Sequence, residues 1–152
     1  MDWHLECSAC GNRRGPEGLP TVCDQCGQPW LVRYPDRPAP SLTARAEVRR
    51  GHGMWRFRPF LPLEPGESPI TLGEGDTPLL ECRRLGERVG IADLWVKDEA
   101  ANPTGSFKAR GLSAAVTRAV AAGASKLVIP TAGNAGVAAA AYAARAGASV
   151  RV

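Results

Sequence analysis

From about residue 70 onward the chain alternates short apolar runs with longer, helix-like runs, and this alternation restricts the fold more than any other feature. The expected strands are PLLEC, DLWVKDE, KLVIPT and ASVRV, which begin at residues 78, 93, 126 and 148. The expected helices between them are RRLGERVG, SFKARGLSAAVTRAVAAG and NAGVAAAAYAARAG. Strands that alternate with helices predict βαβ units, so we expect an α/β fold with an open parallel sheet. The final run ends the chain inside a strand, so we expect this sheet to be incomplete.

The ends of the expected helices carry residues that are typical of helix caps. Ser106 precedes the second helix, and its hydroxyl is expected to cap the N-terminus. Glycine tolerates the left-handed backbone that often ends a helix, and each helix is followed by one: Gly90, Gly123 and Gly147. The KLVIPT run has the composition of a buried strand, and the alanine-rich third helix predicts close packing against the sheet.

Composition divides the chain into three parts. Residues 1–34 hold four of the five cysteines, and residues 35–69 are expected to form a connector rich in proline and arginine. Residues 70–152 carry the strand and helix pattern. With 152 residues, 44% of them hydrophobic and 22% charged, the chain can form one modest domain and a small additional module.

The cysteines of the first part follow a C-x2-C-x12-C-x2-C pattern, in which each pair is followed by a glycine. They are Cys7, Cys10, Cys23 and Cys26. Four thiolates suit tetrahedral zinc, and a site closed by four protein ligands would be structural. The alternative is a pair of disulfides or redox C-x-x-C motifs, which a chain without a secretion signal disfavours. Cys82, His4 and His52 are expected to lie outside the metal site.

Charge and hydropathy exclude several classes of protein. No apolar run approaches the ~18 residues that suggest a membrane span. The first residues lack a basic and apolar leader, so the cytoplasm is the expected location. A net charge of +4 is too small for a typical nucleic-acid domain. A loose arginine cluster, interleaved with Trp55 and Phe57, is better explained as a solvated linker or domain contact than as a nucleic-acid surface: Arg45, Arg49, Arg50, Arg56 and Arg58.

Lys108 lies where the PTGS turn enters the second helix. The partial positive charge of a helix N-terminus disfavours the charged form of an amine. A neutral amine is what Schiff-base chemistry requires. The residue physics therefore leaves two interpretations open, a solvated lysine and a nucleophile.

A second candidate motif is PTAGNAG, which spans residues 130–136 between an apolar strand and a helix. Thr131, Gly133 and Gly136 allow a tight turn whose backbone amides face outward, and a helix N-terminus favours an anion. The spacing lacks the full G-x-G-x-x-G dinucleotide pattern, so a carboxylate or a small phosphate is the expected guest. An ordinary strand-to-helix turn remains the alternative. Ligands of open parallel sheets bind at the carboxyl ends of strands, so this turn and Lys108 could face one crevice.

Three segments together resemble the N-terminal half of threonine synthases. They are GEGDTPL at 73–79, LWVKDEAANPTGSFKARG at 94–111 and PTAGNAGVAAAAYAARAG at 130–147. Many members of that family also carry an N-terminal cysteine ribbon followed by a connector. The resemblance implies the three-layer, tryptophan synthase β-like fold of pyridoxal-phosphate enzymes, called fold type II, preceded by a small zinc ribbon. The implied reaction converts O-phospho-L-homoserine and water to L-threonine and phosphate.

The resemblance also implies roles for individual residues. Lys108 is similar to the lysine that holds pyridoxal phosphate and later moves protons. Asn134 matches the asparagine that contacts the oxygen on the pyridine ring, and Phe107 would lie against the cofactor. A set of loop residues would receive the carboxylate of a small amino-acid substrate: Thr131, Gly133 and Ala135.

The chain departs from the family in two respects. It lacks the glycine-rich loop that holds the cofactor phosphate, and it lacks the late Ser or Thr that meets the pyridine nitrogen. Both are expected in a second half, which in the full-length protein could also support a homodimer. Two alternative functions stay open: a related lyase, such as a threonine or serine dehydratase or a cysteine synthase-like enzyme, and a non-catalytic zinc-ribbon binding module.

Overall fold

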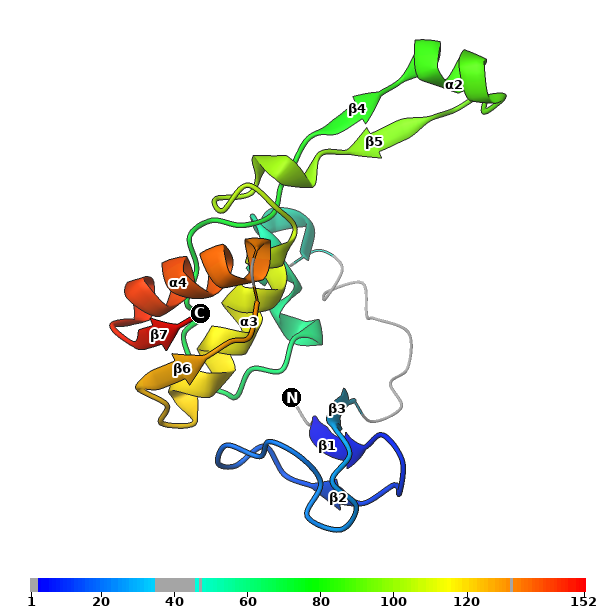
Figure 1. The fold of residues 1–152 in the computed structure, drawn as a ribbon. Coiled ribbons are helices and arrows are strands. Elements are labelled where there is room, and N and C mark those ends of the chain that lie inside the picture. The colour runs from blue at the N-terminus through cyan, green and yellow to red at the C-terminus, as the bar shows by residue number, and fades with distance from the viewer. Residues whose placement is uncertain (1–2, 35–45, 47, 132) are drawn as a thin grey trace.

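The computed structural model describes residues 3–34, 46, 48–131 and 133–152. Arg45 and much of the expected 35–69 connector lie outside these residues, so the division of the chain at residues 34 and 69 stays a prediction. None of the described helices combines the length and the apolar character that are needed to cross a bilayer. Figure 1 shows the cysteine-bearing N-terminal part at one end of the molecule and a thin arm at the other.

The N-terminal part is a small antiparallel sheet of three strands in the order β2-β1-β3. The strands are β1 (His4–Cys7), β2 (Arg13–Arg14) and β3 (Trp30–Arg33). Burial alternates along β1, so that Leu5 and Cys7 face inward as expected for a strand with one solvated face. The paired cysteines therefore lie at the ends of strands and in the turns that connect them.

Residues 48–69 contribute to the core, although their sequence shows no clear periodicity. A 3-10 helix, η1 (Met54–Phe60), turns the chain, and Met54 and Leu63 are both buried. The Trp55 indole points to the following loop, where its Nε1 donates to Glu74 over 2.8 Å. Part of the expected connector is therefore packed against the α/β part of the chain.

The arm consists of β4 (Leu79–Glu81), α2 (Arg83–Val89) and β5 (Trp95–Lys97). The three elements and the left-handed cap at Gly90 confirm the sequence prediction. The prediction of one parallel sheet is wrong here, because β4 and β5 pair antiparallel with each other. The physical reason is visible in Figure 1: α2 lies at the tip of the strand pair, whereas a parallel crossover helix would pack across its face.

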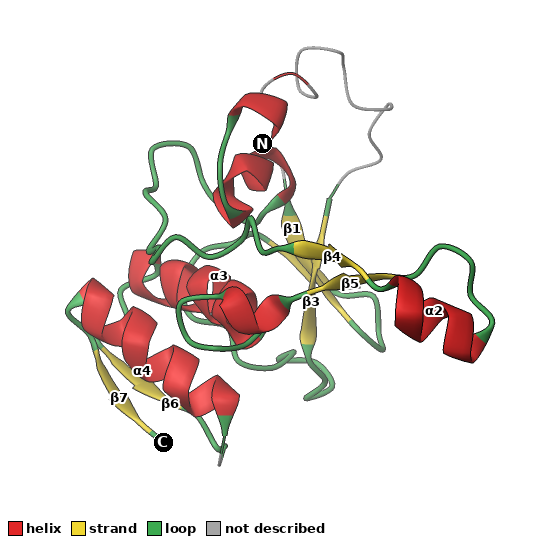
Figure 2. Ribbon diagram, turned by 90° about the horizontal axis from the view of Figure 1, so that it is seen from above, coloured by secondary structure: helices red, strands yellow, loops and turns green. Residues whose placement is uncertain are grey.

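The last four elements form the parallel unit that the sequence predicted. They are α3 (Lys108–Ala121), β6 (Lys126–Val128), α4 (Asn134–Ala146) and β7 (Ser149–Arg151), and β6 pairs parallel with β7. Figure 2 shows α4 lying along the strand pair with α3 beside it. Gly147 ends α4 in the left-handed conformation, as expected. The prediction that KLVIPT is buried is wrong for this structure, since Val128 is 77% exposed on a sheet of two strands.

The core lies between α3 and α4. Its fully buried members are Ala109 and Val116 from α3 and Ala138 and Tyr142 from α4. Small side chains on both helices allow their backbones to approach closely, which explains why an alanine-rich sequence forms this interface. The chain is thus α/β in class, with small separate sheets among the described residues.

Candidate functional site

Lys108 is the first residue of α3, and its side chain is partly buried. The Nζ atom lies 4.5 Å from the centroid of the Phe107 ring, within the range of a cation–π contact. Phe107 itself is 56% exposed, so the amine and the ring share one accessible position. A reactant can therefore approach this amine from solvent.

The prediction that Ser106 caps α3 through its hydroxyl is wrong. The residue at the cap position is Phe107, and no side chain caps the helix. Ser106 instead accepts a hydrogen bond from the Ala109 backbone N–H through its carbonyl oxygen, at 3.2 Å. Its hydroxyl is buried and has no hydrogen-bond partner among the described residues, and the same holds for the hydroxyl of Thr104. Two unsatisfied hydroxyl groups thus lie within four residues of Lys108, which is unusual for buried polar atoms.

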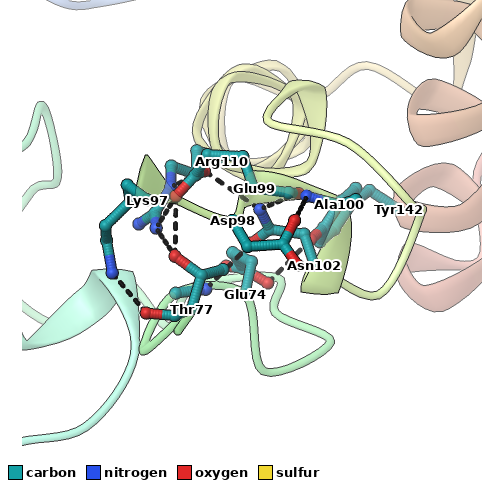
Figure 3. Close-up of polar contacts among 10 residues, drawn as sticks. Glu74, Thr77, Lys97, Asp98, Glu99, Ala100, Asn102, Arg110 and Tyr142 are labelled. Atoms are coloured by element: carbon teal, nitrogen blue, oxygen red, sulfur yellow. Dashed lines mark hydrogen bonds and ion pairs between the residues drawn. The ribbon is translucent and has the colours of Figure 1, made fainter. Parts of the chain in front are cut away.

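An ion pair holds the first turn of α3 in place. Arg110 contacts both carboxylate oxygens of Glu99, with Nε to Oε2 at 2.6 Å and Nη2 to Oε1 at 2.8 Å. Thr77 donates to the same carboxylate over 2.7 Å, and Asn102 donates to it over 3.0 Å. Figure 3 shows these side chains pointing toward one another. Arg110, opposed by burial, lowers the pKa of Glu99 to about 2, so the pair is ionised at neutral pH.

Glu74 is a functional candidate that the sequence reasoning missed. It lies in the GEGDTPL segment and is 1% exposed. Its Oε1 accepts hydrogen bonds from Trp55 at 2.8 Å and from Ser113 at 2.6 Å. Its Oε2 accepts from the Tyr142 hydroxyl at 2.7 Å. The signal that could have indicated this burial is the glycine on each side, since Gly73 and Gly75 both adopt positive φ.

The second predicted motif lies at the start of α4. Asn134 is its first helical residue and is exposed, and Gly133 precedes it. The Gly133 N–H donates to the Thr131 hydroxyl over 3.3 Å. Gly136 is closely packed, because a methyl group there would lie 2.8 Å from a side-chain carbon of Val152. The turn is therefore compact.

The two motifs lie on neighbouring helices. Figures 1 and 2 show α3 and α4 packed against each other with their N-terminal ends on the same side of the pair. Within the part of the chain that the structure describes, no hydrogen bond joins Lys108 to the 131–136 turn. The structure thus brings the two helix starts to one side of the helix pair.

The four cysteines of the N-terminal part are clustered. They are Cys7, Cys10, Cys23 and Cys26, and their sulfur atoms all lie within 4.8 Å of one another. The Cys7 and Cys26 sulfurs are 3.3 Å apart, and the Cys10 and Cys23 sulfurs are 3.7 Å apart. All are free thiols, so the disulfide alternative is not what the structure contains. The cluster could hold a metal ion.

The local environment favours thiolate at one member of the cluster and disfavours it at another. Backbone N–H groups of Cys10 and Ala9 lower the pKa of the Cys7 thiol to about 6. The Asn12 backbone lowers the pKa of the Cys10 thiol, but the neighbouring Cys7 sulfur and burial outweigh it and raise that pKa to about 12. Four adjacent thiolates repel one another, so they deprotonate together only beside a cation.

A separate cavity of about 270 Å³ lies between the N-terminal sheet and the second half of α3. Trp3, Pro16 and Arg118 are among its lining residues. Arg118 joins the two parts of the chain, with its guanidinium 4.9 Å from the centre of the Trp3 ring and an ion pair of 2.6 Å to Glu67. The cavity is therefore an interface feature, far along α3 from Lys108.

Comparison with known proteins identifies the family of the chain. Residues 70–152 match the family model described as pyridoxal-phosphate dependent enzyme. The chain is 36% identical over 150 residues to a threonine synthase of Methanosarcina acetivorans, which covers 99% of this chain and 36% of that protein. It is 35% identical over 142 residues to a threonine synthase of Methanocaldococcus jannaschii, covering 93% of this chain and 35% of the relative. A threonine synthase of Mycobacterium leprae is 47% identical over 91 residues, which are 60% of this chain and 25% of that protein. The chain thus spans about a third of the length of the first relatives it matches.

Proposed function

This chain belongs to the family of pyridoxal-phosphate dependent enzymes, and from that premise we propose that it forms the N-terminal part of a threonine synthase. The proposed reaction converts O-phospho-L-homoserine and water to L-threonine and phosphate. The observation that carries the proposal is the match to the Methanosarcina threonine synthase, which runs through both the cysteine cluster and Lys108. A related dehydratase or β-replacement enzyme is the alternative within the same family.

The residues at the start of α3 fit pyridoxal phosphate chemically. Lys108 offers an accessible amine, and two buried hydroxyls near it have no partner in the described structure. When bound, the cofactor supplies an electron sink for charge at the substrate α-carbon. Lys108 would hold the cofactor through Nζ and would move the α-proton of the substrate with the same atom. The Phe107 ring beside that amine would lie against the bound cofactor.

The start of α4 supplies the second set of proposed contacts. The Asn134 side-chain amide would hydrogen-bond the oxygen on the pyridine ring. The turn formed by Thr131, Gly133 and Ala135 would receive the substrate carboxylate, since the N–H groups of a helix start favour an anion. Support comes from the position of both helix starts on one side of the α3–α4 pair.

The assay is phosphate release from O-phospho-L-homoserine by the full-length protein. We expect Lys108→Ala to abolish phosphate release and the visible absorbance of bound cofactor. Lys126→Ala is the matched control, because Lys126 is an exposed lysine on β6 and should change neither quantity. Formation of 2-oxobutyrate from threonine, or consumption of sulfide with O-acetylserine, without any phosphate release would favour the alternative enzymes and overturn the proposal.

We further propose that the four clustered cysteines hold a structural zinc ion. A Zn–S bond of about 2.3 Å places the sulfurs of a tetrahedral site roughly 3.8 Å apart. Two sulfur pairs, at 3.3 and 3.7 Å, and a cluster in which all four sulfurs lie within 4.8 Å of one another are compatible with that spacing. With four protein ligands the ion has no position for water, so its role would be to stabilise the N-terminal sheet.

Native mass spectrometry of protein purified under reducing conditions tests the zinc site. We expect one zinc ion per chain, and we expect Cys23→Ser to lose it. Cys82→Ser is the matched control, since Cys82 lies in the arm and should leave the zinc content unchanged. Zinc content near zero in the unaltered protein would refute this part of the proposal.

The remaining parts of the proposal concern the whole protein. We propose that residues 70–152 enter the three-layer sheet of fold type II, after a zinc ribbon at 1–34 and a connector at 35–69. The free thiols support a reducing compartment such as the cytoplasm. A homodimer of the full-length protein, which size-exclusion chromatography with light scattering would detect, completes the proposal.

A further inference from the structure

Glu74 is a buried carboxylate to which the proposed reaction gives no role. It lies in the loop before β4, between two glycines with φ of 89° and 105°. At Gly75 a side chain would collide with the backbone of the neighbouring Met54, so the loop can close over the core only with glycine there. The loop thereby places a charged group where only a compensated charge is tolerated.

Within the described residues, the Glu74 carboxylate accepts all of its hydrogen bonds. Besides Trp55, Ser113 and Tyr142, the Thr71 hydroxyl donates over 3.1 Å and the Leu72 backbone N–H over 3.0 Å. Burial raises the pKa of Glu74, but the hydrogen bonds from these donors outweigh burial and leave it below its ordinary value. The carboxylate is therefore ionised at neutral pH and is stabilised by neutral donors.

Two of the donors belong to the helices that carry the proposed site. Ser113 is on α3, five residues after Lys108, which is about 7.5 Å along a helix. Tyr142 is on α4, eight residues after Asn134, or about 12 Å along that helix. Bonds of 2.6 and 2.7 Å to one carboxylate fix these two points relative to each other. The offset between the two helix starts follows from that connection.

We propose that Glu74 is a positioning residue that sets the distance between Lys108 and Asn134 by tying α3 to α4. The inference rests on the proposed function, in which Lys108 holds the cofactor and Asn134 meets its ring oxygen. The hydrogen bonds of Glu74 reach α3 and α4 at Ser113 and Tyr142, so its effect is transmitted through the two helices. Through Glu74, the GEGDTPL segment would be part of the proposed site, although this segment lies outside the two predicted motifs.

The test uses the full-length protein with Glu74→Gln, which keeps the size of the side chain and removes its charge. An amide NH₂ group would then face the donors that now bond one of the two oxygens. The matched control is Glu87→Gln, an exposed carboxyl on α2. Tyr142→Phe is a second, milder variant, which removes only the hydrogen bond between α4 and Glu74. It tests the positioning role if Glu74→Gln does not fold.

Two readouts separate positioning from stability. The first is the pH midpoint of the absorbance of bound cofactor, which depends on how Asn134 is placed relative to the lysine-held ring. The second is the separate effect on kcat and KM. A misplacement of about 1 Å costs on the order of 100-fold in rate, so we expect kcat to fall roughly 10- to 100-fold with a smaller change in KM. The midpoint should shift in both Glu74→Gln and Tyr142→Phe.

The possible outcomes distinguish a failure of the inference about Glu74 from a failure of the proposed function. Variants that unfold more easily but keep the kcat and the pH midpoint of the unaltered protein would show that Glu74 is structural only, and would overturn the inference. If the unaltered protein binds cofactor but releases no phosphate, the proposed reaction fails while the absorbance titration still decides the role of Glu74. Absence of bound-cofactor absorbance in the unaltered protein would overturn the inference as well.

Discussion

Replacing Tyr142 by phenylalanine isolates one contact of the buried cluster. Tyr142 is fully buried between α3 and α4, and its hydroxyl donates to Glu74 over 2.7 Å. Phenylalanine keeps the ring and its packing and removes only that donor. The stability change therefore measures what the bond to the buried carboxylate contributes.

The expected loss follows from the charge on the acceptor. A hydrogen bond to an ionised group contributes about 1.5–3 kcal/mol to stability. For a chain of this size each kcal/mol shifts the melting temperature by roughly 2–4 °C, so the variant should melt on the order of 3–12 °C lower. Glu74 keeps its other donors, which is why the loss should stay within this range and the fold should survive.

The pH dependence gives a second signature of the same contact. Burial, followed by the hydrogen bond to Glu74 and the charge of that carboxylate, raises the pKa of Tyr142 well above its ordinary value of 10.0. A raised pKa means that the contribution of the Tyr142 hydroxyl is complete below pH 10 and is lost as the pH rises from 10 through the raised value. The pKa of Glu74 is lowered, so its contribution is complete above pH 4.5 and is lost as the pH falls through the lowered value. The difference between the two proteins should be constant from pH 5 to 10 and should shrink on either side.

Urea denaturation of the 152-residue chain, followed by circular dichroism at several pH values, measures these quantities. The reference is the unaltered chain, measured at the same pH values. The reasoning is refuted if Tyr142→Phe is as stable as the unaltered chain at neutral pH. It is refuted equally if the deficit of Tyr142→Phe does not change between pH 7 and pH 12.

Three further perturbations address other contacts. Gly75→Ala should lower the melting temperature more than Gly18→Ala, because both positions have left-handed φ but only at 75 would the methyl group meet a backbone nitrogen; equal effects would contradict the close approach. Glu99→Gln should destabilise the chain at neutral pH and flatten its acid transition between pH 4.5 and 2, since a pKa of about 2 means that the contribution of Glu99 is lost across that interval; an unchanged transition in acid titration would contradict the ion pair. Arg118→Gln should shift the Trp3 indole resonance in an NMR spectrum, because the guanidinium 4.9 Å from that ring is removed; a stationary resonance would mean that the two parts of the chain do not pack there.

The local pattern of the sequence predicted the elements well where local forces decide. The alternation of apolar and helical runs, and the glycines after α2 and α4, were confirmed with nearly the expected bounds. Strand pairing was harder to predict, because the sequence between β4 and β5 contains a helix long enough to suggest a crossover. Whether such a helix crosses the face of the strands or stays at their tip depends on tertiary packing. The pairing of β4 with β5 was therefore mispredicted.

The candidate site was only partly accessible to sequence reasoning. Lys108 and Asn134 could be singled out because each stands at a helix start with a recognisable turn before it. Glu74 had only the flanking glycines as a signal, since an isolated glutamate is ordinarily exposed and its donors come from positions as far apart as 55 and 142. Only the folded arrangement shows that one carboxylate meets four segments. The roles of Lys108 and Asn134 themselves stay predictions until the variants are measured.

The composition of α4 has a consequence for how the two helices find their alignment. Apart from Tyr142, the buried face of α4 is made of glycine and alanine, including Ala138, Ala139 and Ala143. If α4 moved along α3 by one helical turn, its methyl groups would present a surface of nearly the same shape. Packing alone therefore distinguishes poorly between neighbouring alignments of the two helices. A single phenol removes this degeneracy, because in one alignment its hydroxyl meets Glu74 and in the others it is buried without an acceptor. Along α4, alanines can therefore exchange with other small residues more freely than the tyrosine can change its position in the sequence.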